Sequence, residues 1–238
     1  MIQIAGLRKS FGPKPVLAGV DLAVGQGESL CVIGQSGTGK SVLLKCILGL
    51  TAPDAGQILW QGRPLDHATR PAFLARFGML FQGAALFDSL TIWQNVAFRL
   101  RQRMPDRQAR AIAIEKLARV GLGPETAELM PAELSGGMVK RAGLARAIAD
   151  DPAVIFFDEP TTGLDPIRAR RINGLIRGIV TETGATAITI THDMDSVRAI
   201  GDRVALLQDG RIAWDGPVAQ MDKAAPLAGF LGHALGQS

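Results

Sequence analysis

The chain has 238 residues, 47% of them hydrophobic and 20% charged, which is enough to bury the core of one large domain or of a core with an inserted subdomain. No apolar run approaches the roughly 18 residues that a membrane-spanning helix needs, and the first residues lack the pattern of a secretory signal. A formal net charge of +4 is compatible with nucleic acid or an anionic membrane surface as a partner. We therefore expect a chain that does not cross a bilayer and resides in the cytoplasm.

Cysteine usage argues against disulfide, metal and redox roles. The two cysteines, Cys31 and Cys46, lie in apolar segments and lack the spacing of metal ligands. Two are also too few for a disulfide framework. We expect both to be buried free thiols.

The N-terminal region reads as a small antiparallel sheet. Residues 2–7, 19–24 and 56–62 have alternating or near-alternating apolar residues separated by glycine turns. Phe11 precedes a Gly-Pro turn and stands before the next glycine-rich loop at the separation expected for an adenine-stacking aromatic. The alternative for Phe11 is a core phenylalanine.

Residues 34–41 read GQSGTGKS and satisfy the phosphate-loop pattern GxxxxGK[ST] between a strand-like and a helical run. Glycines allow the backbone to wrap an oligophosphate, and the following helix presents its positive end to the anion. Lys40 would reach the β- and γ-phosphates, and Ser41 would give a hydroxyl to Mg²⁺. The predicted nucleotide contacts from this loop are Gly34, Gln35, Ser36, Gly37, Thr38, Gly39, Lys40, Ser41 and Val42.

Gln82 ends a strand-like run and opens a region, residues 84–149, in which strand signals disappear and helical composition takes over. Its amide could touch Mg²⁺ or water, and its place between two regions could transmit movement from one to the other. The alternative is a solvent-facing loop glutamine.

Residues 98–119 carry seven basic against two acidic residues, a local excess that could account for the whole net charge. One interpretation is a solvated helical face. The other is contact with a membrane protein or with acidic lipid headgroups.

Two carboxylates follow the strand-like run Val154–Phe157, at the end where an α/β sheet usually builds its site. Asp158 is placed to hold Mg²⁺, and Glu159 can act as general base toward water. His192 follows another strand-like run and is expected to contact the γ-phosphate, although a lone histidine is usually structural.

The order of elements predicts an α/β fold. Strand-like runs alternate with helical stretches, which favours a largely parallel phosphate-loop nucleotide hydrolase core with an N-terminal antiparallel β-subdomain and an inserted helical subdomain. Within a single domain, 1–238, we assign residues 1–83 and 150–221 to the core, 84–149 to the helical subdomain, and 222–238 to a weakly amphipathic tail.

Residues 134–138 read LSGGM, and together with the phosphate loop and the two carboxylates they make the chain resemble the ABC ATPases. The resemblance spans nearly the whole chain and implies the following assignments: Phe11 in the aromatic loop, Gln82 in the Q-loop, Ser135, Gly136 and Gly137 in the signature, Asp165 in the D-loop and His192 as the switch histidine. It also implies an ATPase with ATP and Mg²⁺ as cofactors. Two copies would face each other head to tail, each signature closing over the other's ATP.

Met138 departs from the Gln that the family commonly has after the two glycines. With the residues around Gln82 and the run GLDPIRA, it resembles the ATPases of Mla/Mce phospholipid transport systems, which implies a function in lipid asymmetry of the outer membrane. Such systems imply further partners: an integral membrane permease, a small regulatory subunit and a periplasmic lipid-binding protein. They place the ATPase on the cytoplasmic side of the bacterial inner membrane. Another ABC importer or exporter is the alternative.

A soluble ABC ATPase acting on ribosomes or DNA is the rival from a different class. The chain has one phosphate loop, no heptad array and no aromatic residues interleaved with its arginines. We therefore expect no nucleic-acid partner.

Overall fold

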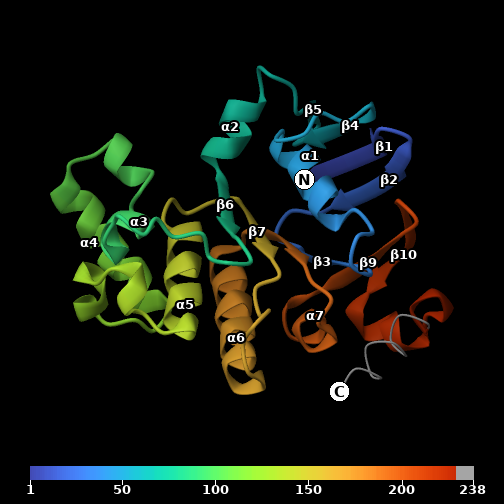
Figure 1. Cartoon of the computed structure of the whole chain (residues 1–238). Helices are drawn as coiled ribbons and strands as arrows, with labels where there is room; N and C mark the ends of the chain where they lie inside the picture. The colour runs from blue at the N-terminus through green and yellow to red at the C-terminus, as the bar shows by residue number, and fades with distance from the viewer. Residues whose placement is uncertain (229–238) are drawn as a thin grey trace. The chain divides into compact units, whose positions relative to one another are not determined.

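The computed structural model describes residues 1–228 and divides into two compact units, 1–75 with 186–228 and 76–185. Residues 229–238 of the predicted tail lie outside the described part. Figure 1 gives the order of the elements. In residues 1–228, no helix is long and apolar enough to cross a bilayer.

The first unit contains the predicted antiparallel sheet, in the order β2 (Lys14–Val24), β1 (Ile2–Phe11), β4 (Ala55–Trp60) and β5 (Arg63–Pro64). Ile2, Ile4 and Leu7 of β1 are fully or almost fully buried; the period of two holds from Ile2 to Ile4 and is shifted by the irregularity between Ile4 and Leu7. The predicted N-terminal antiparallel sheet is confirmed.

The first unit also holds strands of the second sheet, where β3 (Ser29–Ile33) runs parallel to both β8 (Thr186–Ile190) and β9 (Arg203–Gln208). Strand β10 (Arg211–Pro217) pairs antiparallel with β9. All residues of β3 and β8 are buried, which explains their continuous apolar composition. The helical elements of this unit include α1 (Lys40–Leu48), α2 (Arg70–Ala75), α7 (Met194–Ile200) and the 3₁₀ segment η4 (Val218–Lys223).

The second unit pairs β6 (Phe77–Leu80) in parallel with β7 (Val154–Asp158). Between these strands every element is helical, as predicted for residues 84–149: α3 (Ile92–Val96), η1 (Leu100–Gln102), α4 (Asp106–Arg119), η2 (Pro124–Glu128), η3 (Pro131–Glu133) and α5 (Gly136–Ala147). Helix α6 (Pro166–Thr183) follows β7. The α/β fold class is confirmed, while the finer domain boundaries stay a prediction.

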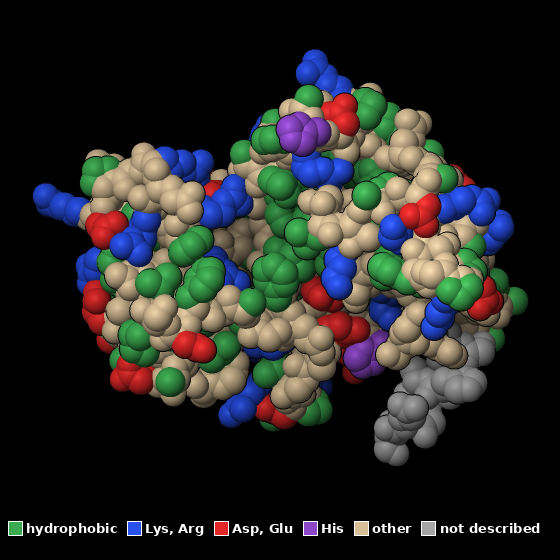
Figure 2. Space-filling model, turned by 45° about the horizontal axis from the view of Figure 1, so that its top comes forward, with side chains coloured by type: hydrophobic (Ala, Val, Ile, Leu, Met, Phe, Trp, Pro, Cys, Tyr) green, Lys and Arg blue, Asp and Glu red, His purple; other side chains and the backbone are tan. Residues whose placement is uncertain are grey.

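The basic stretch is largely paired with acidic residues. Six of its seven basic side chains make ion pairs, and the acidic partners outside the stretch are Glu128, Asp150, Asp151 and Glu182. Figure 2 shows blue and red side chains interspersed on the visible face. The local excess is therefore mostly compensated within the second unit, which removes the main reason to expect a strongly positive surface there.

The predicted state of the cysteines is confirmed. Cys31 and Cys46 are free and buried. Burial raises the pKa of the Cys31 thiol to about 12, so this group is an inert core residue at neutral pH.

Candidate functional site

The phosphate loop joins β3 to α1 in the first unit, in the strand–loop–helix context that the motif requires. Gly34, Gly37 and Gly39 have φ angles of +157°, +81° and +104°, a backbone conformation that other L residues rarely adopt. A Cβ atom at Gly34 would overlap the carbonyl oxygen of Leu207. One at Gly39 would lie 3.0 Å from the Val16 side chain. The two ends of the loop are therefore tightly packed against their own chain, while residues 35–37 between them are exposed and their backbone is within reach of an anion.

Lys40 lies at the first position of α1 and folds back over the loop. Its ammonium donates to the carbonyl oxygens of Gly34 at 2.6 Å and Gln35 at 2.9 Å, and the residue is only 8% exposed. An ammonium group has three donors and can exchange a carbonyl for a phosphate oxygen. Ser41 follows with an exposed side chain. These features fit an oligophosphate.

Phe11 and His192 belong to the same unit as the phosphate loop. Phe11 ends β1 with 54% of its surface exposed, so the alternative of a core phenylalanine is wrong. It pairs with Lys14 on the strand that also carries Val16, and Lys9 lies 5.6 Å from the centre of its ring.

His192 is exposed and follows β8, which lies parallel beside β3. It therefore leaves the sheet at the same edge as the phosphate loop. Asp193 caps the next helix by accepting from the Asp195 amide. The expectation that a histidine stands at a strand end near the phosphate loop agrees with this topology.

The two predicted carboxylates end β7 in the second unit. Asp158 and Glu159 are both partly exposed, and Glu159 has a φ of +47°. A left-handed conformation is uncommon for a non-glycine residue and is a frequent feature of functional turns. Thr162 Oγ1 donates to the Glu159 carboxylate at 3.0 Å. The carboxylate is thus oriented by a neighbour three residues on.

The signature segment caps α5. Ser135 is the N-cap residue and its hydroxyl accepts from the Met138 amide at 3.4 Å. Ser135 and Gly136 are exposed, and a Cβ atom at Gly136 would meet no atom within 4 Å. The first turn of a helix carries free N–H groups and the positive end of its dipole. This segment is therefore an exposed helix N-terminus whose chemistry would suit an anion.

Asp165 caps α6 by accepting from the amides of Ile167 at 3.1 Å and Arg168 at 3.0 Å. These backbone hydrogen bonds, chiefly that from Arg168, lower the pKa of the Asp165 carboxyl. The residue that the resemblance assigns to the D-loop is therefore also a helix cap.

Gln82 lies in the exposed segment after β6. Its backbone carbonyl accepts a hydrogen bond from Lys140 Nζ, a contact that joins residues 58 apart in the sequence. Lys140 was not singled out from the sequence, because its partners come from distant segments.

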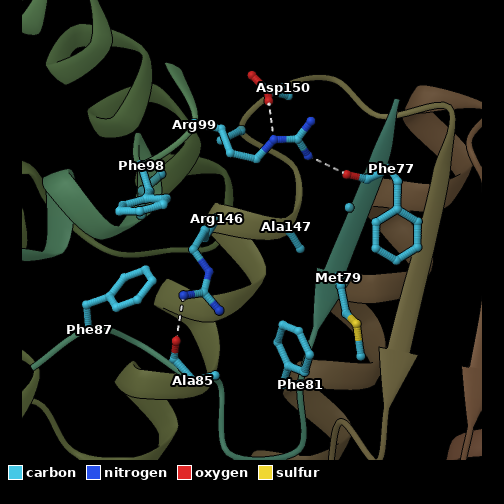
Figure 3. A pocket seen from close by; sticks show the side chains of 13 residues that line it. Phe77, Met79, Phe81, Ala85, Phe87, Phe98, Arg99, Arg146, Ala147 and Asp150 are labelled. Atoms are coloured by element: carbon cyan, nitrogen blue, oxygen red, sulfur yellow. Dashed lines mark hydrogen bonds and ion pairs between the residues drawn. The ribbon is translucent and has the colours of Figure 1, made fainter. Parts of the chain in front are cut away.

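The second unit also contains a groove that the sequence patterns do not predict. It has a volume of about 380 Å³, and its lining includes Phe81, Phe87 and Phe98, which are 40%, 44% and 37% exposed. Figure 3 shows these rings with the Arg146 guanidinium, which donates to the Ala85 carbonyl. Arg99 donates to the Phe77 carbonyl and pairs with Asp150 on another wall. The three phenylalanines come from residues 81–98, between the end of β6 and the start of η1.

In the described part of the chain, no cluster of three or more His, Cys, Asp or Glu side chains could hold a metal ion by itself. Magnesium does not require one, because it is commonly bound by one or two protein oxygens together with substrate phosphates and water. The predicted ligands Ser41, Gln82 and Asp158 have that chemistry.

Comparison with known proteins matches residues 17–162 to the ABC transporter family. Two similar relatives are the methionine import ATP-binding protein MetN of Mesorhizobium japonicum, 40% identical over 92% of this chain, and the probable ribonucleotide transport ATP-binding protein mkl of Mycobacterium tuberculosis, 40% identical over 91%. The chain spans 60% and 61% of the length of these relatives.

Solved structures agree. The dimeric structure of the cassette MJ0796 is 30% identical with a TM-score of 0.83, covering 92% of this chain and 99% of that one. The cbiO1 protein of Clostridium perfringens, part of the ABC transporter complex cbiONQ, is 27% identical with a TM-score of 0.84, covering 99% and 98%. The chain belongs to the ABC transporter family.

Proposed function

We propose that this chain binds ATP with Mg²⁺ and hydrolyses it as the nucleotide-binding subunit of an ABC transporter. The observation that carries the proposal is the phosphate loop, in which three glycines with positive φ and the folded-back Lys40 ammonium form an anion cradle. Bound Mg²⁺ would neutralise charge on the β- and γ-phosphates. Ser41, Gln82 and Asp158 would hold it.

Glu159 is the proposed general base. A carboxylate held by Thr162 can accept a proton from water as that water attacks the γ-phosphorus. His192 would stabilise the departing phosphate by hydrogen bonding to it. Phe11 would stack on the adenine ring, which agrees with its exposed face.

The purified chain tests the activity directly. It should release phosphate from ATP only with Mg²⁺ present, and Lys40→Ala should weaken binding of a fluorescent ATP analogue. Full binding and turnover in that variant would contradict the proposed cradle.

We further propose that two copies act together, each signature receiving the γ-phosphate held by the other copy. The exposed Ser135 and Gly136 at the start of α5 support this, because a Cβ atom at Gly136 would meet no described atom outside its own helix turn within 4 Å. The similar cassette MJ0796 has been solved as a dimer, and also in a post-hydrolysis state with ADP and phosphate.

The groove of the second unit is the proposed docking site for a helix of an integral membrane permease. Its exposed phenylalanine rings suit apolar side chains, and the Phe87 and Phe98 rings lie 4.6 Å apart as a paired surface. Arg99 and Asp150 at the wall can orient polar groups of the arriving helix. The proposed location is peripheral, on the cytoplasmic side of the bacterial inner membrane.

Phe87→Asp tests this docking site. It should abolish assembly with the permease while the ATPase activity of the isolated chain persists. Leu50→Asp is the matched control, because Leu50 is 71% exposed and does not line the groove. Equal loss of assembly in both variants would contradict a specific site.

For the cargo we propose phospholipid, in a system concerned with outer-membrane lipid asymmetry. The support is Met138, the run GAALFDSLT after Gln82, and GLDPIRA after the carboxylates. Such a system would add a small regulatory subunit and a periplasmic lipid-binding protein. The rival cargo is methionine, favoured by the 40% identity to a methionine import protein.

The assembled transporter in vesicles distinguishes these cargoes. Its ATPase rate should respond to phospholipid composition and to the lipid-binding protein. A response to methionine with its binding protein, and none to lipid, would replace the phospholipid proposal. Genes encoded beside this one provide an independent check, since they should specify a permease and a membrane-anchored lipid-binding protein.

A further inference from the structure

One face of α5 is fixed to the segment that carries Gln82. Lys140, Gly143 and Arg146 recur at intervals of three along this helix, so they lie on the same side of it. A Cβ atom at Gly143 would lie 2.8 Å from that of Ala84, which shows how closely the segment packs on the helix. Arg146 donates to the carbonyl oxygens of Ala84 and Ala85 at 2.5 and 2.7 Å.

The segment fixed in this way has an unusual backbone. Ala84 and Ala85 have φ angles of +60° and +51°. Consecutive alanines rarely adopt this conformation, and it persists where surrounding contacts impose it. The contacts with α5 are such contacts. Segment 82–85 and α5 are therefore held as one piece.

Lys140 extends this attachment to the carboxylate end of β7. The residue is 7% exposed, and its ammonium donates to the Gln82 carbonyl and lies 3.5 Å from the Glu159 carbonyl. Burial lowers the pKa of the Lys140 ammonium, and the nearby carboxylates of Glu159 and Asp158 oppose that shift. One side chain of the signature helix thus contacts the backbone of Gln82 and lies beside the backbone of Glu159, at the end of β7 that carries the two carboxylates.

We propose that Lys140 is a positioning residue that joins the signature helix to Gln82 and Glu159 of its own chain. Lys140 lies in the helix that Ser135 caps, so a shift of the cap displaces the ammonium with it. This inference rests on the proposed head-to-tail dimer, in which Ser135 contacts the ATP of the other copy. When the other copy's ATP binds at Ser135, Lys140 would move with α5 and change the position of Glu159 in its own chain. Binding at one ATP site would thereby affect hydrolysis at the second, which makes turnover cooperative.

The test compares three substitutions of Lys140 with one control in full-length chains. K140M removes the donor and the charge, K140Q keeps an amide donor, and K140R keeps the charge. K116M is the matched control, because Lys116 is also buried in the second unit and ion-paired, with Asp151 at 2.7 Å. The readouts are kcat, the Hill coefficient for ATP, binding of an ATP analogue, and Tm.

We expect K140M to lower kcat about tenfold or more and to bring the Hill coefficient from above one to about one, as misplaced catalytic groups do. Analogue binding should stay within about twofold, since the phosphate loop is untouched. K140R should keep most of the parent kcat, and K140Q should have a kcat between those of K140M and K140R. The kcat and Hill coefficient of K116M should match those of the parent chain. If K140M does not fold, K140Q against K140R carries the same comparison.

Two results would overturn the positioning role. One is unchanged kcat and Hill coefficient in K140M and K140Q. The other is an equal loss in K140M and K116M at equal Tm, which would show a purely structural effect. A parent chain that hydrolyses no ATP would instead overturn the proposed function, so the two failures are distinguishable.

Discussion

The phosphate loop and the signature segment are both glycine-rich starts of helices, but their glycines have different surroundings. In the phosphate loop, a Cβ atom at Gly34 would overlap the Leu207 carbonyl oxygen and one at Gly39 would lie tightly against Val16, whereas Gly37 between them is open. In the signature, a Cβ atom at Gly136 would meet no described atom outside its own helix turn within 4 Å, and one at Gly137 would lie 3.7 Å from the Arg168 side chain. The φ angles of Gly34 and Gly39 are positive, and those of Gly136 and Gly137 are not.

This difference shows that glycine serves two purposes in one chain. At Gly34 and Gly39 of the phosphate loop it is favoured by the fold itself, because both the positive φ and the surrounding atoms disfavour a side chain. At the signature the fold of the second unit would accept a side chain. Its open surface therefore suits a ligand that arrives from another molecule, which is the basis of the proposed dimer.

The largest effect is expected for Glu159→Gln. Loss of the general base should lower kcat by roughly 10²-fold or more while ATP binding persists. With ATP, the trapped dimer should also slow deuterium exchange at Ser135–Gly137, which are open in the single chain. The double variant Glu159→Gln with Lys40→Ala is the control. Because it should bind ATP weakly, it should not show the slowed exchange. Normal turnover in Glu159→Gln would rule out the proposed base.

The comparison of glycines is tested by placing alanine at one position of each kind. Gly39→Ala should lower both Tm and ATP binding, because its Cβ would lie 3.0 Å from Val16 at a φ of +104°. Gly136→Ala should leave Tm unchanged or slightly higher, since alanine is the better helix former. It should nevertheless lower turnover by crowding the arriving phosphate. Thermal melting, analogue binding and phosphate release are measured for both variants. An equal loss of Tm in Gly39→Ala and Gly136→Ala would contradict the difference between the two kinds of glycine.

A smaller effect is expected at Asp165, where a helix start serves as an ordinary cap. Its pKa is lowered in the folded state, so its contribution to stability is present above the unfolded-state pKa and is lost as pH falls through the folded-state pKa. Asp165→Asn should therefore reduce Tm slightly at neutral pH. The difference should shrink as the pH falls below about 4 and disappear once the pH is below the lowered folded-state pKa. A difference independent of pH would show that the charge is not involved.

Local patterns in the sequence predicted much of the fold and the site. Three of these patterns involve only residues that are close in the sequence. They are the glycine spacing before Lys40, the two acids after Val154–Phe157, and Ser135 before a helix. Such features follow from backbone conformation, helix capping and strand periodicity. The exposed Phe11 and the capping function of Asp165 needed the structure, because exposure and hydrogen bonding depend on tertiary context.

The features that the sequence did not reveal all involve distant partners. The charge excess at residues 98–119 looked like an exposed basic surface until Asp150 and Glu182 were seen to neutralise part of it. Lys140 donates to the carbonyl of Gln82, which is 58 residues away in the sequence. Ala84 has a positive φ, although alanine ordinarily prefers a negative one. Composition and periodicity carry no information on such pairings.

The most direct test of the shared site mixes two inactive variants, Lys40→Ala and Ser135→Arg. Each alone should show almost no turnover, while Ser135→Arg should still bind ATP as a single chain. An equal mixture should recover up to roughly a quarter of the parent turnover, because half of the dimers then contain one intact phosphate loop facing one intact signature. No recovery at any ratio, or full turnover by Ser135→Arg alone, would contradict the head-to-tail dimer.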